Sequence, residues 1–341
     1  MSQTPQDSPA TQRVAEFKQA HDRIMAEMAR VIVGQQSVIE QILIGLLCRG
    51  HCLLEGMPGL AKTSIIRTLA RLLDLKFQRI QFTPDLMPAD IIGTEIIEQD
   101  PSGRRSFRFI KGPVFANVIL ADEINRTPPK TQAALLESMQ ELHVTAAGTT
   151  YPLDPPFLVL GTQNPIDQEG TYPLPEAQLD RFMLKILVEY PNKADEIRIA
   201  EAYMSDEKPT DRPLLTRDQI GDLQHIVRQV IVSRHVSSYA VSLARATRPS
   251  DPDAPDFIHR WVNWGASPRA SQFMLAAGRA RAILDGRLNV SCDDIRAMAP
   301  PVLRHRLGVS FTAESENINV ETIIQKVIEA VPEPIPHRGE G

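Results

Sequence analysis

The chain has 341 residues, of which 43% are hydrophobic and 23% are charged, a composition typical of folded domains rather than disordered segments. Its formal net charge of −5 excludes the globally basic surface that would hold a nucleic-acid backbone. The three cysteines are too few for a disulfide framework and favour a reducing compartment, so we expect a cytoplasmic protein.

The N-terminal residues 1–12 are polar with two prolines, and we expect a flexible tail there rather than a signal peptide. Residues 13–191 alternate short apolar runs with helical patterns, which predicts an α/β domain built around a parallel sheet. The expected strands are 51–55, 77–82, 118–122, 157–162 and 185–188, and the helices between them include 62–73 and 129–141.

Beyond Pro191 the alternation of a strand pattern stops, and residues 192–331 are expected to form an all-helical domain. A second flexible tail is expected at 332–341, which is rich in Pro and Gly. The expected helices of this part are 194–205, 216–228, 238–247, 270–284 and 292–299. No apolar run reaches the roughly 20 residues of a membrane span, so no direct membrane insertion is expected.

The segment after the first expected strand has the composition of a phosphate-binding loop. Gly56 and Gly59 form a turn, and Lys62 and Thr63 open the helix that follows. Backbone N–H groups of such a turn cradle phosphates, the lysine adds a positive charge, and the hydroxyl can ligate Mg²⁺. Ala61 replaces the last glycine of the strict pattern, and we expect it to be tolerated because the position begins a helix.

Two further strands are expected to end at the same ligand crevice. The buried strand 118–122 ends in Asp122 and Glu123, and acids at such a position are costly unless they have a role. Asp122 is suited to hold Mg²⁺ through water, and Glu123 to orient or deprotonate a water. Asn164, after strand 157–162, is either a ligand of that water or a turn residue before Pro165, and spacing does not decide between them.

With these motifs in order before a helical domain, the chain resembles an AAA+ ATPase. Three strings resemble its MoxR family: DEINRTPPKTQAALLESMQE at 122–141, TQNPIDQEGTYPLPEAQLDRF at 162–182 and GASPRA at 265–270. The resemblance extends from about Val33 to Leu307. It implies an αβα P-loop domain with a five-stranded parallel sheet, followed by an all-α lid.

The resemblance also implies roles for single residues. Glu123 and Asn164 match the Walker B acid and sensor 1, Arg181 matches the arginine finger that acts on a neighbour's nucleotide, and Arg269 matches sensor 2. Thr63 and Asp122 match the Mg²⁺ site. Arg126 is a second candidate for a contact between subunits. The residues that match the ATP-binding segments are Val33, Gly34, Gln35, Gly56, Met57, Pro58, Gly59, Leu60, Ala61, Lys62, Thr63, Ser64 and Asp122.

The resemblance therefore predicts a Mg²⁺-dependent ATPase that forms a ring, usually a hexamer. It implies a chaperone that remodels or assembles a protein client with a von Willebrand factor A domain partner, in metalloenzyme or complex maturation. Two alternatives remain open: an ATPase subunit like that of magnesium chelatase, and a nucleic-acid motor or loader of the same clade. No nucleic acid is expected as a partner.

Two segments resemble hairpin insertions, at 93–112 and 142–156. We assign the second to the helix-2 insert of this clade, which faces the ring pore; it has one acid and no Lys or Arg, which favours a protein client. The first carries Arg104, Arg105, Arg108 and Lys111 beside Phe107 and Phe109. We expect a hairpin with one packed and one solvated face rather than a binder of single-stranded nucleic acid.

Two small clusters are expected to be structural. Cys48, His51 and Cys52 lie close in sequence, but a helix end and an alternating strand cannot bring them together around a metal ion. The run from Arg304 to Arg306 is expected to lie on a solvated helix face.

Overall fold

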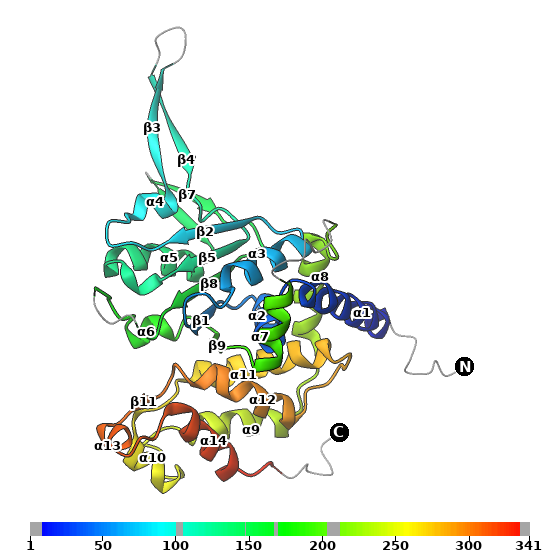
Figure 1. Ribbon diagram of the computed structural model, residues 1–341. Coiled ribbons are helices and arrows are strands. Elements are labelled where there is room, and N and C mark those ends of the chain that lie inside the picture. The colour runs from blue at the N-terminus through cyan, green and yellow to red at the C-terminus, as the bar shows by residue number, and fades with distance from the viewer. Residues whose placement is uncertain (1–8, 100–104, 147, 167–169, 203–211, 335–341) are drawn as a thin grey trace. The chain divides into compact units, whose positions relative to one another are not determined.

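The computed structural model describes residues 9–99, 105–146, 148–166, 170–202 and 212–334 (Figure 1). The chain divides into two compact units. The sheet unit comprises Ile24–Phe182 and Ile186–Gly221, and the helical unit comprises Met1–Arg23, Met183–Lys185 and Asp222–Gly341.

This division differs from the boundary expected at residues 191 and 192. Residues up to 221 belong to the sheet unit because the backbone N–H of Leu214 donates to the carbonyl oxygen of Leu72 at 2.7 Å, and Nε of Arg217 donates to that of Pro155 at 2.6 Å. The expected N-terminal tail is also shorter, because helix α1 (Pro9–Ala29) begins within it. Residues 1–8, and 335–341 of the other expected tail, lie outside the described residues.

The sheet unit contains one five-stranded parallel sheet, as the sequence predicts, and its strand order is β2-β5-β8-β1-β9. Buried residues such as Leu53, Ile119 and Val159 form its core, because β-branched and leucine side chains fill the space under the covering helices. The strands are β1 (Cys52–Gly56), β2 (Phe77–Gln81), β5 (Val118–Asp122), β8 (Leu158–Gln163) and β9 (Leu184–Val188).

Helices connect these strands. α5 begins and ends at the predicted residues, since prolines at its start cannot extend a preceding helix and its apolar residues recur at helical spacing. The helices of this unit are α2 (Gln36–Leu47), α3 (Lys62–Leu72), α4 (Pro88–Ile92), η2 (Ile124–Arg126), α5 (Pro129–Glu141), α6 (Glu176–Leu179), α7 (Lys193–Ala202) and α8 (Arg217–Gln229), the last of which continues into the helical unit.

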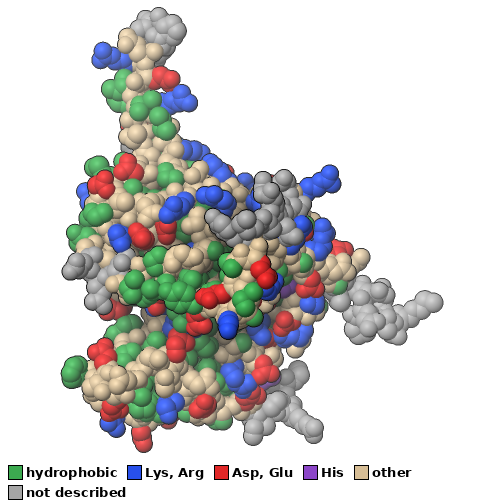
Figure 2. Space-filling view, in the orientation of Figure 1, with side chains coloured by type: hydrophobic (Ala, Val, Ile, Leu, Met, Phe, Trp, Pro, Cys, Tyr) green, Lys and Arg blue, Asp and Glu red, His purple; other side chains and the backbone are tan. Residues whose placement is uncertain are grey.

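Both insertions are antiparallel hairpins: β3 (Gly93–Gln99) with β4 (Arg105–Lys111), and β6 (His143–Ala146) with β7 (Thr149–Pro152). The β3–β4 hairpin extends outward from the sheet unit, with hydrophobic and charged side chains on its surface (Figures 1 and 2). Phe107 is 73% exposed and its cross-strand neighbour Ile97 is 61% exposed. Arg104 lies outside the described residues.

The prediction that one face of this hairpin is packed is therefore wrong along most of its length. Ile96 and Ile110, on the face opposite Ile97, are also exposed, because no described segment covers either face there. Only its base is packed: Phe109 stacks on Tyr151 of β7 with ring centroids 4.5 Å apart.

The order of elements also corrects which hairpin is the helix-2 insert. In the sheet unit, α3 follows β1, α4 follows β2 and α5 follows β5. The β3–β4 hairpin directly follows α4, the second of these helices, whereas β6–β7 follows α5, the third. The assignment of residues 142–156 to the helix-2 insert is therefore wrong, and the lack of Lys and Arg in that hairpin is not a property of the insert.

The helical unit is mainly helical, as expected, but it also contains an antiparallel pair of short strands, β10 (Val262–Trp264) and β11 (Gly308–Val309). It also contains helices that the sequence analysis did not name: α10 (Asp256–Trp261), α13 (Phe311–Ser315) and α14 (Val320–Ala330). The expected helix at 194–205 is α7 of the sheet unit instead, and its last three residues lie outside the described part. The remaining helices are α9 (Arg234–Arg245), α11 (Pro268–Leu284) and α12 (Cys292–Leu303). No described helix is long and apolar enough to cross a bilayer.

The basic run after α12 is not the solvated face expected from the sequence. His305 is 5% exposed and Arg306 is 2% exposed. The guanidinium of Arg306 donates to the carbonyl oxygens of Met183 and Val302 and lies over the ring of Phe273. These contacts allow a buried cation that would otherwise be costly.

His51 has a structural role at the start of β1. Its Nδ1 accepts the backbone N–H of Val159 at 3.0 Å, so Nε2 carries the proton and donates to the carbonyl oxygen of Met139 at 3.1 Å. Burial lowers the pKa of His51 to about 4, partly offset by the bond to Met139. With both ring nitrogens engaged in these hydrogen bonds, the imidazole supports the fold in its neutral form.

This burial predicts a loss of stability in mild acid. Because the pKa is lower in the folded state than the ordinary value of 6.5, the unfolded chain binds more protons between pH 6.5 and 4. The contribution of neutral His51 is complete above pH 6.5 and falls by on the order of 3 kcal/mol as the pH approaches 4. Urea unfolding midpoints should therefore decline less steeply between pH 7.5 and 5 in His51→Gln than in the wild type. An equally steep decline would contradict this account, and His143→Gln, at the start of the β6–β7 hairpin, is the control.

Candidate active site

The loop between β1 and α3 forms one wall of a cavity of about 360 Å³. Gly59 has φ +84°, a conformation that L side chains rarely adopt, and α3 begins three residues later at Lys62. The backbone N–H groups at this helix start are unpaired within the helix and suit an anion. The residues that line the cavity are Pro58, Gly59, Leu60, Ala61, Lys62, Thr63, Ser64, Arg79, Asp122, Glu123, Thr162, Gln163 and Asn164.

Ala61 corrects one step of the sequence argument. The position precedes the helix in the left-handed region, at φ +55° and ψ +17°, rather than in the helical conformation expected from the sequence. A Cβ in this region contacts the carbonyl oxygen closely and costs roughly 1–2 kcal/mol relative to a right-handed residue. The glycine of the strict phosphate-loop pattern avoids this cost, so the loop of this chain holds local strain.

Relief of that strain is a measurable effect. Ala61→Gly removes the Cβ at a left-handed residue, and the greater freedom of glycine in the unfolded chain offsets part of the gain. We expect the free energy of unfolding to rise by about 0.5–1 kcal/mol, measured by urea denaturation. Ala70→Gly, inside α3, should lower stability by a similar amount, and a decrease for both variants would show that Ala61 is not strained.

Lys62 is satisfied within its own loop. Its Nζ donates to the carbonyl oxygens of Gly56 at 2.5 Å and Met57 at 3.2 Å. Burial lowers the pKa of Lys62, and the nearby carboxylates of Asp122 and Glu123 raise it in part. Among the described residues, no carboxylate lies within hydrogen-bond distance of the Lys62 ammonium, so a phosphate group in the cavity offers it a stronger acceptor than the two carbonyl oxygens.

A threonine at the end of β8 forms hydrogen bonds with both acids at the end of β5. The hydroxyl of Thr162 donates to Oδ1 of Asp122 at 2.6 Å and accepts the backbone N–H of Glu123 at 2.8 Å. Glu123 itself adopts φ +57°, an uncommon conformation for a residue with a side chain. Asp122, Glu123 and Thr162 all line the cavity, so the parallel strands bring the two acids predicted from sequence beside the phosphate loop.

Asn164 makes a turn contact and also lines the cavity. Its Oδ1 accepts the backbone N–H of Ile166 at 3.4 Å, which is the local turn contact of an Asn before proline. The residue is 9% exposed and also lines the cavity. The turn contact therefore holds the Asn164 side chain at the cavity wall, and its role toward the attacking water stays a prediction.

The remaining predicted site residues do not line this cavity. Gln35 of the Val33–Gly34–Gln35 segment donates to the carbonyl oxygen of Glu189 at 3.0 Å, and a Cβ on Gly34 would meet the Asp195 carboxylate at 2.7 Å. Gly56 and Met57 lie just before the lining residues and accept from Lys62.

The two arginines predicted from the family resemblance are placed elsewhere. Arg181 follows α6 and its guanidinium donates to the carbonyl oxygen of Leu136 in α5 at 2.9 Å. Arg269 lies in the first turn of α11 in the helical unit, where its N–H donates to the hydroxyl of Ser267 at 3.2 Å. The roles of Arg181 and Arg269 therefore remain predictions.

Sequence reasoning missed three residues that line the cavity: Arg79, Thr162 and Gln163. Thr162 and Gln163 end β8 just before Asn164. The polar end of this strand, which pointed to Asn164, could therefore have identified these two residues as well. Arg79 lies in the middle of β2, where alternation predicts only a solvent-facing side chain.

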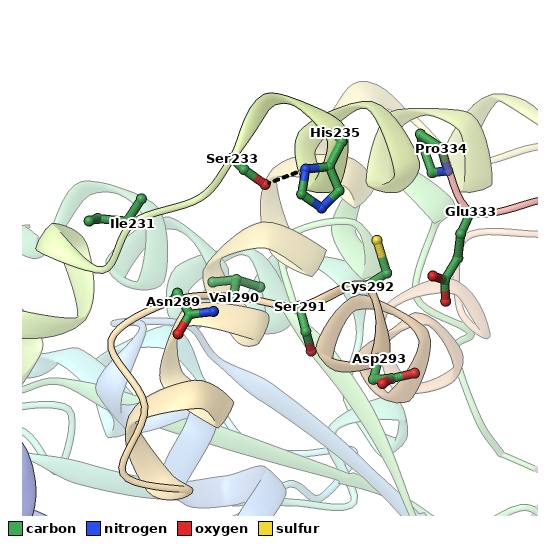
Figure 3. A pocket seen from close by; sticks show the side chains of 10 residues that line it. All are labelled: Ile231, Ser233, His235, Asn289, Val290, Ser291, Cys292, Asp293, Glu333 and Pro334. Atoms are coloured by element: carbon green, nitrogen blue, oxygen red, sulfur yellow. Dashed lines mark hydrogen bonds between the residues drawn. The ribbon is translucent and has the colours of Figure 1, made fainter. Parts of the chain in front are cut away.

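A second cavity, of about 380 Å³, lies within the helical unit, and its lining residues are drawn in Figure 3. His235 bonds to the hydroxyl of Ser233 at 2.9 Å there. Its two acids, Asp293 and Glu333, both pair with Arg296. It therefore has neither a glycine-rich loop nor an acid that is not already in an ion pair, and it does not resemble a phosphate site.

Comparison with known proteins identifies the family. Residues 51–184 match the model of the ATPase family associated with various cellular activities, and residues 257–327 match the AAA lid domain. The chain is 45% identical to Chaperone MoxR1 of Mycobacterium tuberculosis over 322 residues, which is 93% of this chain and 84% of that protein. The chain belongs to the MoxR family of AAA ATPases. Protein MoxR of Methylorubrum extorquens is 32% identical, with 96% and 98% of the two chains covered.

A solved structure agrees with the fold of this MoxR-family chain. The crystal structure of a candidate ATPase from Cytophaga hutchinsonii superposes with a TM-score of 0.87 at 41% sequence identity, and it covers 95% of this chain and 98% of that one. The family and the fold together show that the protein is an ATPase and binds a nucleotide.

The oxygen donors of the cavity fit a magnesium ion. Mg²⁺ prefers oxygen ligands and usually keeps several waters beside one or two carboxylates and the substrate phosphates. Thr63 offers a hydroxyl and Asp122 a carboxylate in the same cavity. Among the described residues no group of three or more His, Cys, Asp or Glu side chains forms a separate metal site.

Proposed function

We propose that this ATPase is a chaperone that uses ATP hydrolysis at the cavity between the phosphate loop and β5 to remodel or assemble a protein client. The observation that carries the proposal is the convergence of Lys62, Thr63, Asp122 and Glu123 on one cavity. The name of the relative MoxR1 supports the chaperone class.

Each residue has a chemical task in this proposal. The loop N–H groups and Lys62 bind the phosphates, and Lys62 exchanges its bonds to Gly56 and Met57 for a phosphate oxygen. Glu123 orients the attacking water and takes its proton, and Asn164 holds the same water. A magnesium ion held by Thr63 and Asp122 would neutralise charge on the phosphates.

The proposal includes assembly. Arg181 completes the site of a neighbouring copy in a ring, which we expect to be a hexamer, and Arg269 contacts the nucleotide from the lid. The partner proposed with it is a von Willebrand factor A domain protein, in the maturation of a metalloenzyme or another complex. The cytoplasmic location expected from the thiol count fits a chain whose three cysteines form no disulfide.

The test is nucleotide-dependent capture. Tagged Glu123→Gln, loaded with ATP, is expected to retain a client and a von Willebrand factor A domain protein that are absent in ADP. Lys62→Ala, which should not hold ATP, is the matched control. Recovery of nucleic acid with replication proteins, or equal recovery in both nucleotides, would contradict the chaperone proposal.

A further inference from the structure

Strand β2 supplies two polar side chains to the acids of β5. The strands pair in parallel with Gln81 opposite Asp122, which places both alternating polar residues of β2 beside the cavity edge. Arg79 donates to Oδ2 of Asp122 from Nε at 3.0 Å and from Nη2 at 2.5 Å.

Both oxygens of the Asp122 carboxylate are thereby occupied. Oδ1 accepts from Thr162 and Oδ2 from Arg79. The Asp122 side chain is 14% exposed, whereas that of Arg79 is 45% exposed. A carboxylate with so little access to water needs a counter-charge, and the guanidinium supplies one from the solvent side of the same cavity.

Gln81 links this ion pair to the second acid. Its Oε1 accepts from Nη2 of Arg79 at 2.5 Å, and its Nε2 donates to Oε2 of Glu123 at 2.9 Å. Arg126 also contacts Oε2 of Glu123, at 3.2 Å. The group proposed to activate water is thus held by two neighbours, one of which is itself oriented by Arg79.

We propose that Arg79 is a built-in counter-ion that occupies Asp122 until magnesium enters with the nucleotide and displaces it. The inference rests on the proposed function, in which Asp122 holds that ion. Two cations compete for the same carboxylate, so Arg79 raises the magnesium concentration needed for nucleotide binding. Displacement of Arg79 also removes the donor to Gln81 Oε1, which loosens the hold of Gln81 on Glu123.

Magnesium dependence of nucleotide binding tests this without hydrolysis. A fluorescent N-methylanthraniloyl-ADP at fixed concentration is titrated with Mg²⁺ from micromolar to millimolar, and a parallel set in EDTA reports affinity without the metal. Arg79→Gln should lower the half-saturating Mg²⁺ concentration by about two- to fivefold, the range expected for a partly exposed ion pair. Arg108→Gln, which removes the same charge from the exposed pair with Glu98, should leave it unchanged.

A second variant separates the counter-ion from general loosening of β2. Gln81→Ala keeps the Arg79–Asp122 pair, so its half-saturating Mg²⁺ concentration should equal that of the wild type. The inference would be overturned if the half-saturating Mg²⁺ concentration were unchanged or higher in Arg79→Gln, or if it fell equally in Gln81→Ala. The proposed function would still stand in either case, provided that the wild type binds the nucleotide in a magnesium-dependent way. Absence of magnesium-dependent binding in the wild type would overturn both.

Discussion

Replacement of Glu123 by Gln is expected to lower the rate of phosphate release by about 10²–10⁴-fold while ATP affinity changes by no more than about threefold. The amide preserves the size of the side chain and its contact with Gln81, but it cannot accept a proton from the attacking water. Because Glu123 is proposed to act on water rather than on the phosphates, the variant should still bind ATP but hydrolyse it slowly.

The measurement pairs steady-state phosphate release with equilibrium binding of a fluorescent ATP analogue. Glu95→Gln, which removes an exposed carboxylate of the β3–β4 hairpin, is the control and should hydrolyse ATP at the wild-type rate. Full activity of Glu123→Gln would exclude Glu123 as the base. Loss of binding in the same variant would place it in nucleotide binding instead.

Arg181→Ala is expected to reduce hydrolysis by on the order of 10³-fold or more, because an arginine that neutralises charge in phosphoryl transfer has an effect of that size. Within its own chain Arg181 does not line the cavity and donates to the carbonyl oxygen of Leu136. Its effect on hydrolysis should therefore depend on a neighbouring copy, and nucleotide affinity of the isolated chain should be preserved.

Mixing variants makes this prediction specific. The Arg181→Ala chain keeps an intact phosphate loop but lacks the arginine finger. The Lys62→Ala chain keeps the arginine finger, but its phosphate loop cannot bind ATP. An equimolar mixture should therefore recover part of the wild-type activity, since some interfaces combine Lys62 of one copy with Arg181 of the next. Activity of the mixture equal to the mean of the two variants alone would contradict a shared site, and Arg105→Ala is the charge-matched control.

The sheet and its nucleotide-facing acids could be predicted from sequence because both follow from local patterns. Short, nearly continuous apolar runs predict buried strands, and parallel strands bring their carboxyl ends to one edge, so Asp122 and Glu123 were expected beside the phosphate loop. The start of α5 was also predictable, because proline fixes a helix start.

The missed features depend on contacts that are distant in sequence or on backbone angles. Arg79 contacts Asp122, 43 positions away, so its role appears only when β2 and β5 pair. Burial of Arg306 depends on a hydrogen bond to the carbonyl oxygen of Met183, and no pattern in the neighbouring sequence predicts that contact. Ala61 looks like an ordinary helix residue until its positive φ is known.

The exposed hairpin illustrates a different limit. Alternation in 93–112 predicts two faces but not whether the fold supplies a surface to cover one of them. Phe109 stacks on Tyr151 at the base of the hairpin, whereas Phe107, two residues earlier, is 73% exposed.

The dependence of specific ATPase activity on protein concentration tests the central claim most directly. Phosphate release per chain is measured with saturating ATP and Mg²⁺ over protein concentrations that span assembly, with the mass of the assembly followed by light scattering. The account predicts that activity per chain rises together with mass, because Arg181 completes the site of a neighbour. Constant activity per chain in dilute monomeric protein would contradict it.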